Sequence, residues 1–202
     1  SNFMANLFAS HPPSEERVRR NQELAAGHSG GARNKAAFDR AMQQVRRDQD
    51  AYTAHEQALA AAQKKDFSQA LNLTEKAIKL QPKEALFYVT KGQLQMANNQ
   101  ESAALPAFQQ AVKLNPEYYL GHLGTGLLQK KAGQNAAAAK SLDASMKLLA
   151  TPLAAYHMGE LALAGGDSAA ARKYFEFAAQ GEGEIAEAAK GQLSRMGAGA
   201  AG

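Results

Sequence analysis

The sequence predicts an all-α fold made of about four consecutive helix pairs. Equivalent glycines recur at Gly92, Gly126 and Gly159, which are 34 and 33 residues apart. Between the two helices of each pair lies a turn, in the stretches QKKDF, ANNQE, KAGQN and AGGDS, which are rich in the residue types that end helices. Apolar residues make up 45% of the chain, and many are alanine, the strongest helix former. A repeating helical array accounts for all three observations.

The second helix of each pair carries a small–large–small pattern. Small residues let neighbouring helices approach closely, and the larger residue fills the space between them. The first small residues are Ala70, Ala104, Ala138 and Ala171; the larger residues are Thr74, Phe108, Leu142 and Phe175; the second small residues are Ala77, Ala111, Ser145 and Ala178. Pro82 and Pro116 then end their helices, and Pro152 is expected to close the third repeat with a slip of two residues.

These residues resemble the tetratricopeptide repeat pattern of small residue, turn, alanine, aromatic, alanine and proline. The resemblance implies a right-handed α-α superhelix. It covers four repeats, at about 51–82, 85–116, 119–150 and 152–183. The first repeat departs from the family at Ala61 and Thr74, where the pattern prefers bulky and aromatic residues. Pro106 predicts a kink or a late start in its helix, because proline removes a backbone donor.

Helices are also expected on both sides of the repeats. Phe38, Met42, Val45 and Tyr52 fall at helical spacing, which predicts one long helix that begins near residue 33 and continues into the first repeat. A shorter helix, Ser14 to Ala26, is expected before it. Residues 184–196 read as a capping helix, since repeat arrays need a polar end. Residues 197–202 are expected to form a disordered tail.

No catalytic, cofactor or metal site is predicted in this chain. It contains no cysteine, and its five histidines form no pair at metal-ligand spacing. The stretch HEQAL begins like the zinc-protease motif HExxH, but Leu59 stands where the second histidine is required. The net charge of +4 comes from basic residues interleaved with acidic ones, which disfavours nucleic-acid binding. No apolar run approaches the roughly 20 residues of a membrane span.

The family resemblance implies a binding groove lined by the first helix of each repeat, at its second, fifth, ninth and twelfth positions. Those positions hold Tyr52, His55, Leu59 and Ala62; Leu86, Val89, Gln93 and Met96; Leu120, Leu123, Leu127 and Lys130; and Leu153, Tyr156, Glu160 and Leu163. This mostly apolar set suits an extended or helical polypeptide with apolar anchors. The alternative is that some of these leucines pack between helices. The Lys and Asn of the family's carboxylate clamp are missing, which disfavours acidic tails as ligands.

The stretch FASHPPSEERV, residues 8–18, resembles the closing motif of the zinc metallopeptidases of family 48. The matching residues are Phe8, Ser10, His11, Pro12, Pro13, Arg17 and Val18. Bacterial members of that family carry tetratricopeptide repeats after the protease domain. The resemblance therefore implies that residues 1–32 are a protease-domain remnant and linker. It also implies that the parent protein is a zinc metalloendopeptidase, whose zinc site lies upstream. The periplasm or cell envelope is the implied location, with the cytoplasm left open.

The leading functional hypothesis is an interaction module that binds substrate or partner polypeptides for this attached protease, in bacterial envelope protein quality control. The alternative is a stand-alone tetratricopeptide adaptor or assembly factor. An enzyme acting on its own is the weakest reading. Because Phe8 would have lost its packing partners, the N-terminal segment is expected to be mobile, to pack against the repeats or to pair with another copy of the chain.

Overall fold

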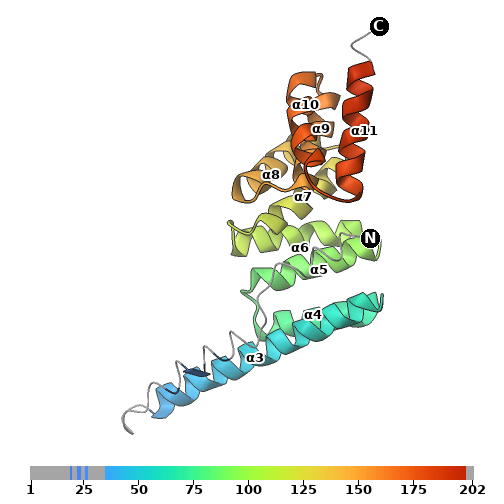
Figure 1. Ribbon diagram of the computed structural model, residues 1–202. Coiled ribbons are helices and arrows are strands. Elements are labelled where there is room, and N and C mark those ends of the chain that lie inside the picture. Colours follow the sequence, from blue (N-terminus) through green and yellow to red (C-terminus); the bar gives the residue numbers. More distant parts are fainter. Residues whose placement is uncertain (1–18, 20–21, 24–25, 27–34, 199–202) are drawn as a thin grey trace. The chain divides into compact units, whose positions relative to one another are not determined.

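The computed structural model describes residues 35–198 and, before them, residues 19, 22, 23 and 26. Over these residues the secondary structure is entirely helical, which confirms the all-α fold class (Figure 1). The expected remnant at 1–32 and helix at 14–26 lie outside the described residues, apart from those four positions. The chain divides into two compact units. The boundary in the sequence lies between Asn99 and Gln100, inside the second predicted repeat. Each unit is described by itself.

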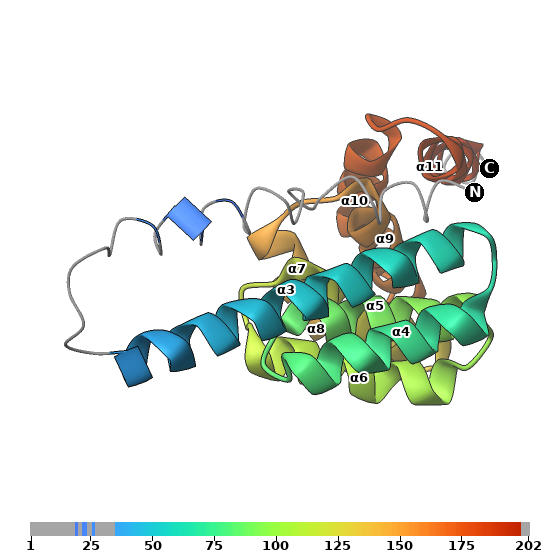
Figure 2. The same cartoon turned by 90° about the horizontal axis from the view of Figure 1, so that it is seen from below.

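Unit 1 contains α3 (Lys35–Gln63), α4 (Phe67–Leu80) and α5 (Ala85–Ala97). Figures 1 and 2 show α4 running alongside the C-terminal half of α3, and α5 also packs on α4. The core of this unit gathers Ala51, Ala54, Ala77 and Ile78 around the fully buried Phe87. Alanines on α3 and α4 allow the close approach, and one aromatic ring from α5 completes the packing.

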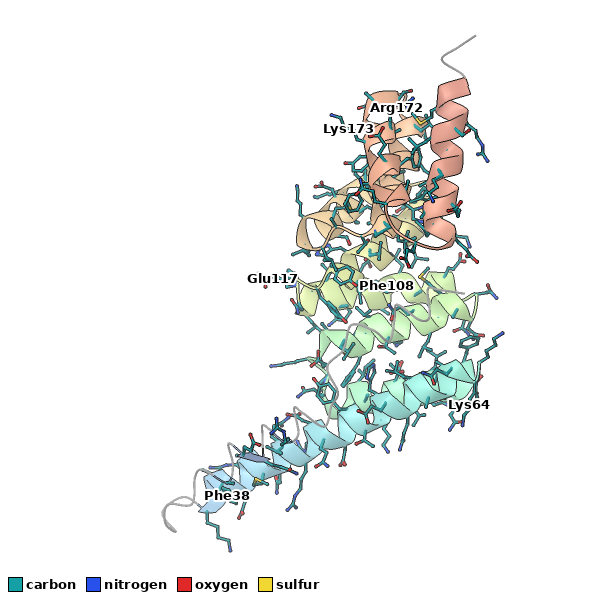
Figure 3. All side chains as sticks on the ribbon, in the orientation of Figure 1. Phe38, Lys64, Phe108, Glu117, Arg172 and Lys173 are labelled. Atoms are coloured by element: carbon teal, nitrogen blue, oxygen red, sulfur yellow. The ribbon has the colours of Figure 1, made fainter. Side chains whose placement is uncertain are left out.

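The N-terminal half of α3 contributes no buried residue. Residues 35–50 are exposed or half-buried, and the first buried residue of the helix is Ala51. Phe38 is 49% exposed, and Figure 3 shows it near the start of α3, with Lys64 at the opposite end where the chain turns into α4. The long helix is therefore anchored by its C-terminal half.

The described part of unit 2 from residue 100 to residue 198 contains six helices. They are α6 (Glu101–Leu114), α7 (Tyr119–Lys131), α8 (Asn135–Leu148), α9 (Pro152–Ala164), α10 (Ser168–Ala179) and α11 (Glu184–Ala198). Each helix from α7 to α10 packs against the one before it and the one after it, and α11 covers α10 and part of α9 (Figure 1). Helix α11 continues to Ala198, so residues 197 and 198, which were expected in the tail, are helical.

Large residues of the second helices meet glycines of the first helices in this unit. A Cβ atom added at Gly159 would lie 2.7 Å from Phe175 Cε1, closer than such contacts come in proteins. Phe108, which Figure 3 labels on α6, is 1% exposed. The pairs are Gly124 with Phe108, Gly126 with Leu142, and Gly159 with Phe175. Gly126 and Gly159, two of the three recurring glycines, therefore mark points where two helices approach too closely for any side chain.

Thr74 stands where the other repeats have Phe108, Leu142 and Phe175. It is fully buried, and its Oγ1 donates a hydrogen bond of 2.8 Å to the carbonyl oxygen of Ala70, one turn earlier on α4. The hydroxyl is thus satisfied within its own helix, and the smaller side chain is accommodated without an unpaired polar group.

The turn inside each helix pair contains one left-handed residue at the same repeat position. The residues and their φ angles are Lys65 (61°), Asn99 (57°), Gly133 (74°) and Gly166 (83°). Each immediately precedes the N-cap of the second helix. Asp66 and Asp167 cap their helices through a side-chain oxygen, which accepts the backbone N–H of Gln69 at 3.0 Å and of Ala170 at 2.9 Å.

Pro152 corrects one expectation. Pro82 and Pro116 lie in the connections after α4 and α6, but Pro152 is the first residue of α9. Thr151 caps that helix, its Oγ1 accepting the N–H of Ala154 at 3.2 Å. Proline is favoured at the first helical position, where its missing N–H costs nothing. The proline therefore begins the fourth repeat rather than closing the third, and the expected slip of two residues disappears.

Pro106 lies inside α6, which begins at Glu101. The expected late start of this helix is therefore wrong. The ring of Pro106 is exposed, so it does not disturb the buried face, which carries Ala104, Ala107 and Phe108. Packing of that face keeps the segment helical despite the lost backbone donor.

Candidate functional site

The predicted groove residues lie on the first helices of the repeats, which are α3 and α5 in unit 1 and α7 and α9 in unit 2. Five of them are buried: His55 is 3% exposed, Ala62 1%, Val89 0%, Gln93 5% and Leu123 6%. They offer no surface to a ligand, which corrects the prediction for these five residues. For Leu123 the alternative of packing between helices holds, since it joins Leu142 and Ala154 in one buried cluster.

His55 has a structural role in unit 1. Its Nε2 lies 2.9 Å from Thr90 Oγ1, and its ring centroid lies 5.1 Å from that of Phe87. The Tyr52 hydroxyl donates a hydrogen bond to the Glu84 carboxylate. Leu59, Leu86 and Met96 are half-buried, like Tyr52, while Ala62 is buried. Of the eight predicted groove residues in this unit, four therefore remain partly accessible: Tyr52, Leu59, Leu86 and Met96.

Unit 2 keeps more of its predicted residues accessible. We define the α7–α9 surface by seven residues: Leu120, Leu127, Lys130, Leu153, Tyr156, Glu160 and Leu163. Six of the seven are half-buried, and Leu163 is 38% exposed. Leu120, Leu127 and Leu153 pack on the buried cluster around Leu123, so their positions are fixed by the core beneath them. The surface is apolar and rigidly supported.

A polar cluster lies within this apolar surface. Lys130 Nζ on α7 and His157 Nδ1 on α9 both contact Glu160 Oε2, at 2.9 Å and 2.8 Å. The side chains of Lys130, His157 and Glu160 are 26%, 22% and 29% exposed, so the cluster is only partly solvated. His157 is not among the predicted site residues. The signal that could have found it is the spacing His157–Glu160, since residues three apart share a helix face.

The cluster is electrically neutral at neutral pH. Burial lowers the pKa of His157, the charge of Lys130 acts in the same direction, and the hydrogen bond to Glu160 opposes both without reversing the shift. For Glu160, burial raises the pKa, but the hydrogen bonds from Lys130 and His157 outweigh it, so its pKa is lowered. Glu160 is therefore ionised and His157 uncharged, and the positive charge of Lys130 balances the carboxylate.

Acid should weaken the fold through this cluster. The lowered pKa of His157 means that the unfolded chain takes up this proton first as the pH falls below the ordinary value of 6.5. Glu160 acts in the same direction below 4.5. We expect the free energy of unfolding to fall between about pH 8 and about pH 5, and to fall less in His157→Gln. Urea denaturation of both proteins at the two pH values measures this. An equal fall in both proteins would contradict it.

Within residues 35–198, no three His, Cys, Asp or Glu side chains gather as a metal-ion site. None of the helices described in the structure is long and apolar enough to cross a membrane.

Solved structures share the fold of this chain. The first tetratricopeptide domain of Spaghetti (RPAP3), solved with the HSP90 peptide SRMEEVD, has a TM-score of 0.57 at 15% identity and covers 59% of this chain and 95% of its own. The crystal structure of MamA has a TM-score of 0.58 at 22% identity and covers 72% and 89%. The Arabidopsis OM64 tetratricopeptide domain has a TM-score of 0.56 at 18% identity and covers 58% and 98%. These identities show the fold alone.

At the sequence level, no curated protein matches the chain significantly. A tetratricopeptide repeat family model matches residues 55–118 and again residues 89–148. The two matches overlap and together span the first three predicted repeats almost completely. With the helix pairs and the structural neighbours, they show that residues 55–148 of this chain form tetratricopeptide repeats.

Proposed function

We propose that this chain is a protein–protein interaction module whose α7–α9 surface binds a polypeptide segment through apolar anchors. The observation that carries the proposal is the row of half-buried leucines on adjacent first helices, held from below by Leu123, Leu142 and Ala154. Such pre-organised apolar side chains bind without a large entropic cost of ordering. Binding would also cover the exposed Leu163 at the end of α9.

Two further observations bear on the ligand class. The similar Spaghetti domain was solved with a bound peptide, which supports a polypeptide ligand. That peptide, SRMEEVD, is acidic, whereas the carboxylate-clamp positions of this chain hold buried residues such as His55 and Val89. We therefore favour apolar anchors over an acidic tail.

Leu163→Glu tests the binding surface. The full chain would select peptides from a phage-displayed library of random dodecapeptides, and the enriched peptide would be synthesised with a fluorophore. We expect Leu163→Glu to weaken binding at least about tenfold in fluorescence polarisation, because a carboxylate would be desolvated against the apolar ligand.

Leu148→Glu is the matched control. Leu148 is 42% exposed, much like Leu163, but it lies on α8, the second helix of its repeat. Its substitution should leave binding unchanged, and both variants should keep the helical circular dichroism of the parent. Equal losses in the two variants, or a library that yields no apolar peptide, would refute the proposed surface.

We further propose that the parent protein is a zinc metalloendopeptidase of the bacterial envelope, and that this chain is its non-catalytic, cofactor-free part, presenting polypeptides in protein quality control. The support is the resemblance of residues 8–18 to the closing motif of family 48. The N-terminal segment remains our candidate for pairing two copies. Sequencing the gene upstream tests the protease link: an open reading frame without HExxH before Asn6 would leave a stand-alone adaptor instead.

A further inference from the structure

Two polar atoms of the cluster formed by Lys130, His157 and Glu160 have no hydrogen-bond partner among the described residues. Both contacts of the Glu160 carboxylate go to Oε2, from Lys130 and from His157. Among the described residues, none makes a hydrogen bond or ion pair with Glu160 Oε1 or His157 Nε2. Both atoms lack a partner in this part of the chain, but neither is fully buried, so solvent reaches both. A ligand on this surface could therefore reach them too.

The hydrogen-bonding roles of these atoms follow from the chemistry of the groups. An ionised carboxylate only accepts, so Nδ1 of His157 must carry the proton that it shares with Glu160. Nε2 of the uncharged ring is then an acceptor, a state that the lowered pKa of His157 favours. The Lys130 ammonium has three N–H donors, of which one faces Glu160. The cluster thus offers two acceptors and further donors, with no net charge.

We propose that Lys130, His157 and Glu160 form a subsite that selects an uncharged carboxamide, the side chain of Asn or Gln, in the bound polypeptide. Its NH2 group can donate to Glu160 Oε1 and its oxygen can accept from the Lys130 ammonium, while His157 holds the carboxylate in place through Oε2. An Arg or Lys of the ligand would meet the charge of Lys130, and an Asp or Glu that of Glu160. An aliphatic side chain would leave the polar atoms desolvated and unpaired.

The position of the subsite sets the wider ligand class. Leu127 lies one turn before Lys130 on α7, and Leu163 lies one turn after Glu160 on α9. Apolar contacts are therefore available next to the polar cluster on both helices. The inference rests on the proposed function, because it refines which polypeptide the same surface takes: one with an Asn or Gln beside apolar anchors.

Peptide selection tests the preference. The full chain would select from displayed dodecapeptides that carry two fixed leucines with four randomised positions between them. We expect Asn or Gln to be enriched at one of these positions. The enriched peptide would then be synthesised with that residue and with Glu, Lys or Met in its place. Each replacement should weaken binding about tenfold, as expected for the loss of one or two hydrogen bonds.

A pair of double variants assigns the preference to the cluster. Lys130→Met with Glu160→Met removes both charges together, so no buried charge is left unpaired. It should still bind the leucine peptides, with equal affinity for the carboxamide and Met versions. The matched control is Lys131→Met with Glu101→Met. It removes an exposed ion pair whose lysine is the residue after Lys130 on α7. The control should keep the tenfold preference.

The outcomes separate the two proposals. Absence of any leucine-peptide binding would overturn the proposed function and the subsite with it. Leucine-peptide binding without an Asn or Gln preference, or with a preference for charged residues, would overturn the subsite alone. A carboxamide preference that survives in Lys130→Met with Glu160→Met would also overturn it, since other residues would then be responsible.

Discussion

Replacing Phe175 with alanine is expected to lower the free energy of unfolding by about 3–5 kcal/mol. The ring is fully buried in one cluster with Ala155, Ala171, Ala178 and Ala189, and larger half-buried side chains such as Tyr156 and Leu193 pack against this cluster. Alanine methyl groups on packed helices cannot swing into the space that the ring would leave. Part of the cavity would therefore stay open, and the cost lies in the range typical of Phe→Ala changes in a core.

Phe177→Ala is the control for this experiment. It makes the same substitution two residues later on α10, at a side chain that is 37% exposed. A loss of about 1 kcal/mol or less is expected there, because no closed cavity forms. Urea denaturation followed by circular dichroism measures both variants. Equal losses would mean that Phe175 does not hold α9, α10 and α11 together as the structure indicates.

Gly124→Ala is expected to lower the free energy of unfolding by about 1–3 kcal/mol, as overpacking does in close-packed cores. The new Cβ would lie 2.4–2.6 Å from three ring atoms of Phe108. That ring is 1% exposed and cannot turn away without moving α6. Helix propensity alone predicts the opposite sign, since alanine is better than glycine inside a helix by up to about 1 kcal/mol.

Gly191→Ala separates the two effects. Gly191 lies in the interior of α11, and a Cβ atom there would meet nothing within 4 Å. This variant should raise the free energy of unfolding by about 0.5–1 kcal/mol, the propensity gain without a clash. Thermal and urea unfolding of both variants give the signs directly. A stabilising Gly124→Ala would show that α6 and α7 approach less closely than described.

The repeated packing could be predicted from the sequence because the same contact occurs more than once. Gly126 meets Leu142 and Gly159 meets Phe175 in equivalent places, so a single steric requirement produces a periodic pattern in the sequence. The need for a left-handed residue in each turn produces a similar pattern at Gly133 and Gly166. Periodicity thus indicated the helix pairs and most of their large core residues.

The binding surface could be predicted only in part, because periodicity gives the face of a helix but not how far a neighbour covers it. Leu123 and Leu127 are one turn apart on α7, yet the first is buried and the second half-buried. His157 was missed because its role depends on Lys130, which comes from the preceding repeat and meets it only through Glu160. The prediction that Pro152 closes the third repeat was wrong because proline is common both just after a helix and at the first position of the next helix.

The connection that ends at Thr151 also shows where this architecture absorbs changes in length. The connections after α4 and α6 span four residues, 81–84 and 115–118, whereas the one after α8 spans three, 149–151. The missing residue accounts for the single step of 33 in an otherwise 34-residue period, and it leaves the helices and their contacts intact. Such an array can therefore accumulate insertions and deletions between repeats rather than within them during evolution. For the same reason, the exposed Leu149 in this connection is a suitable attachment point for a label.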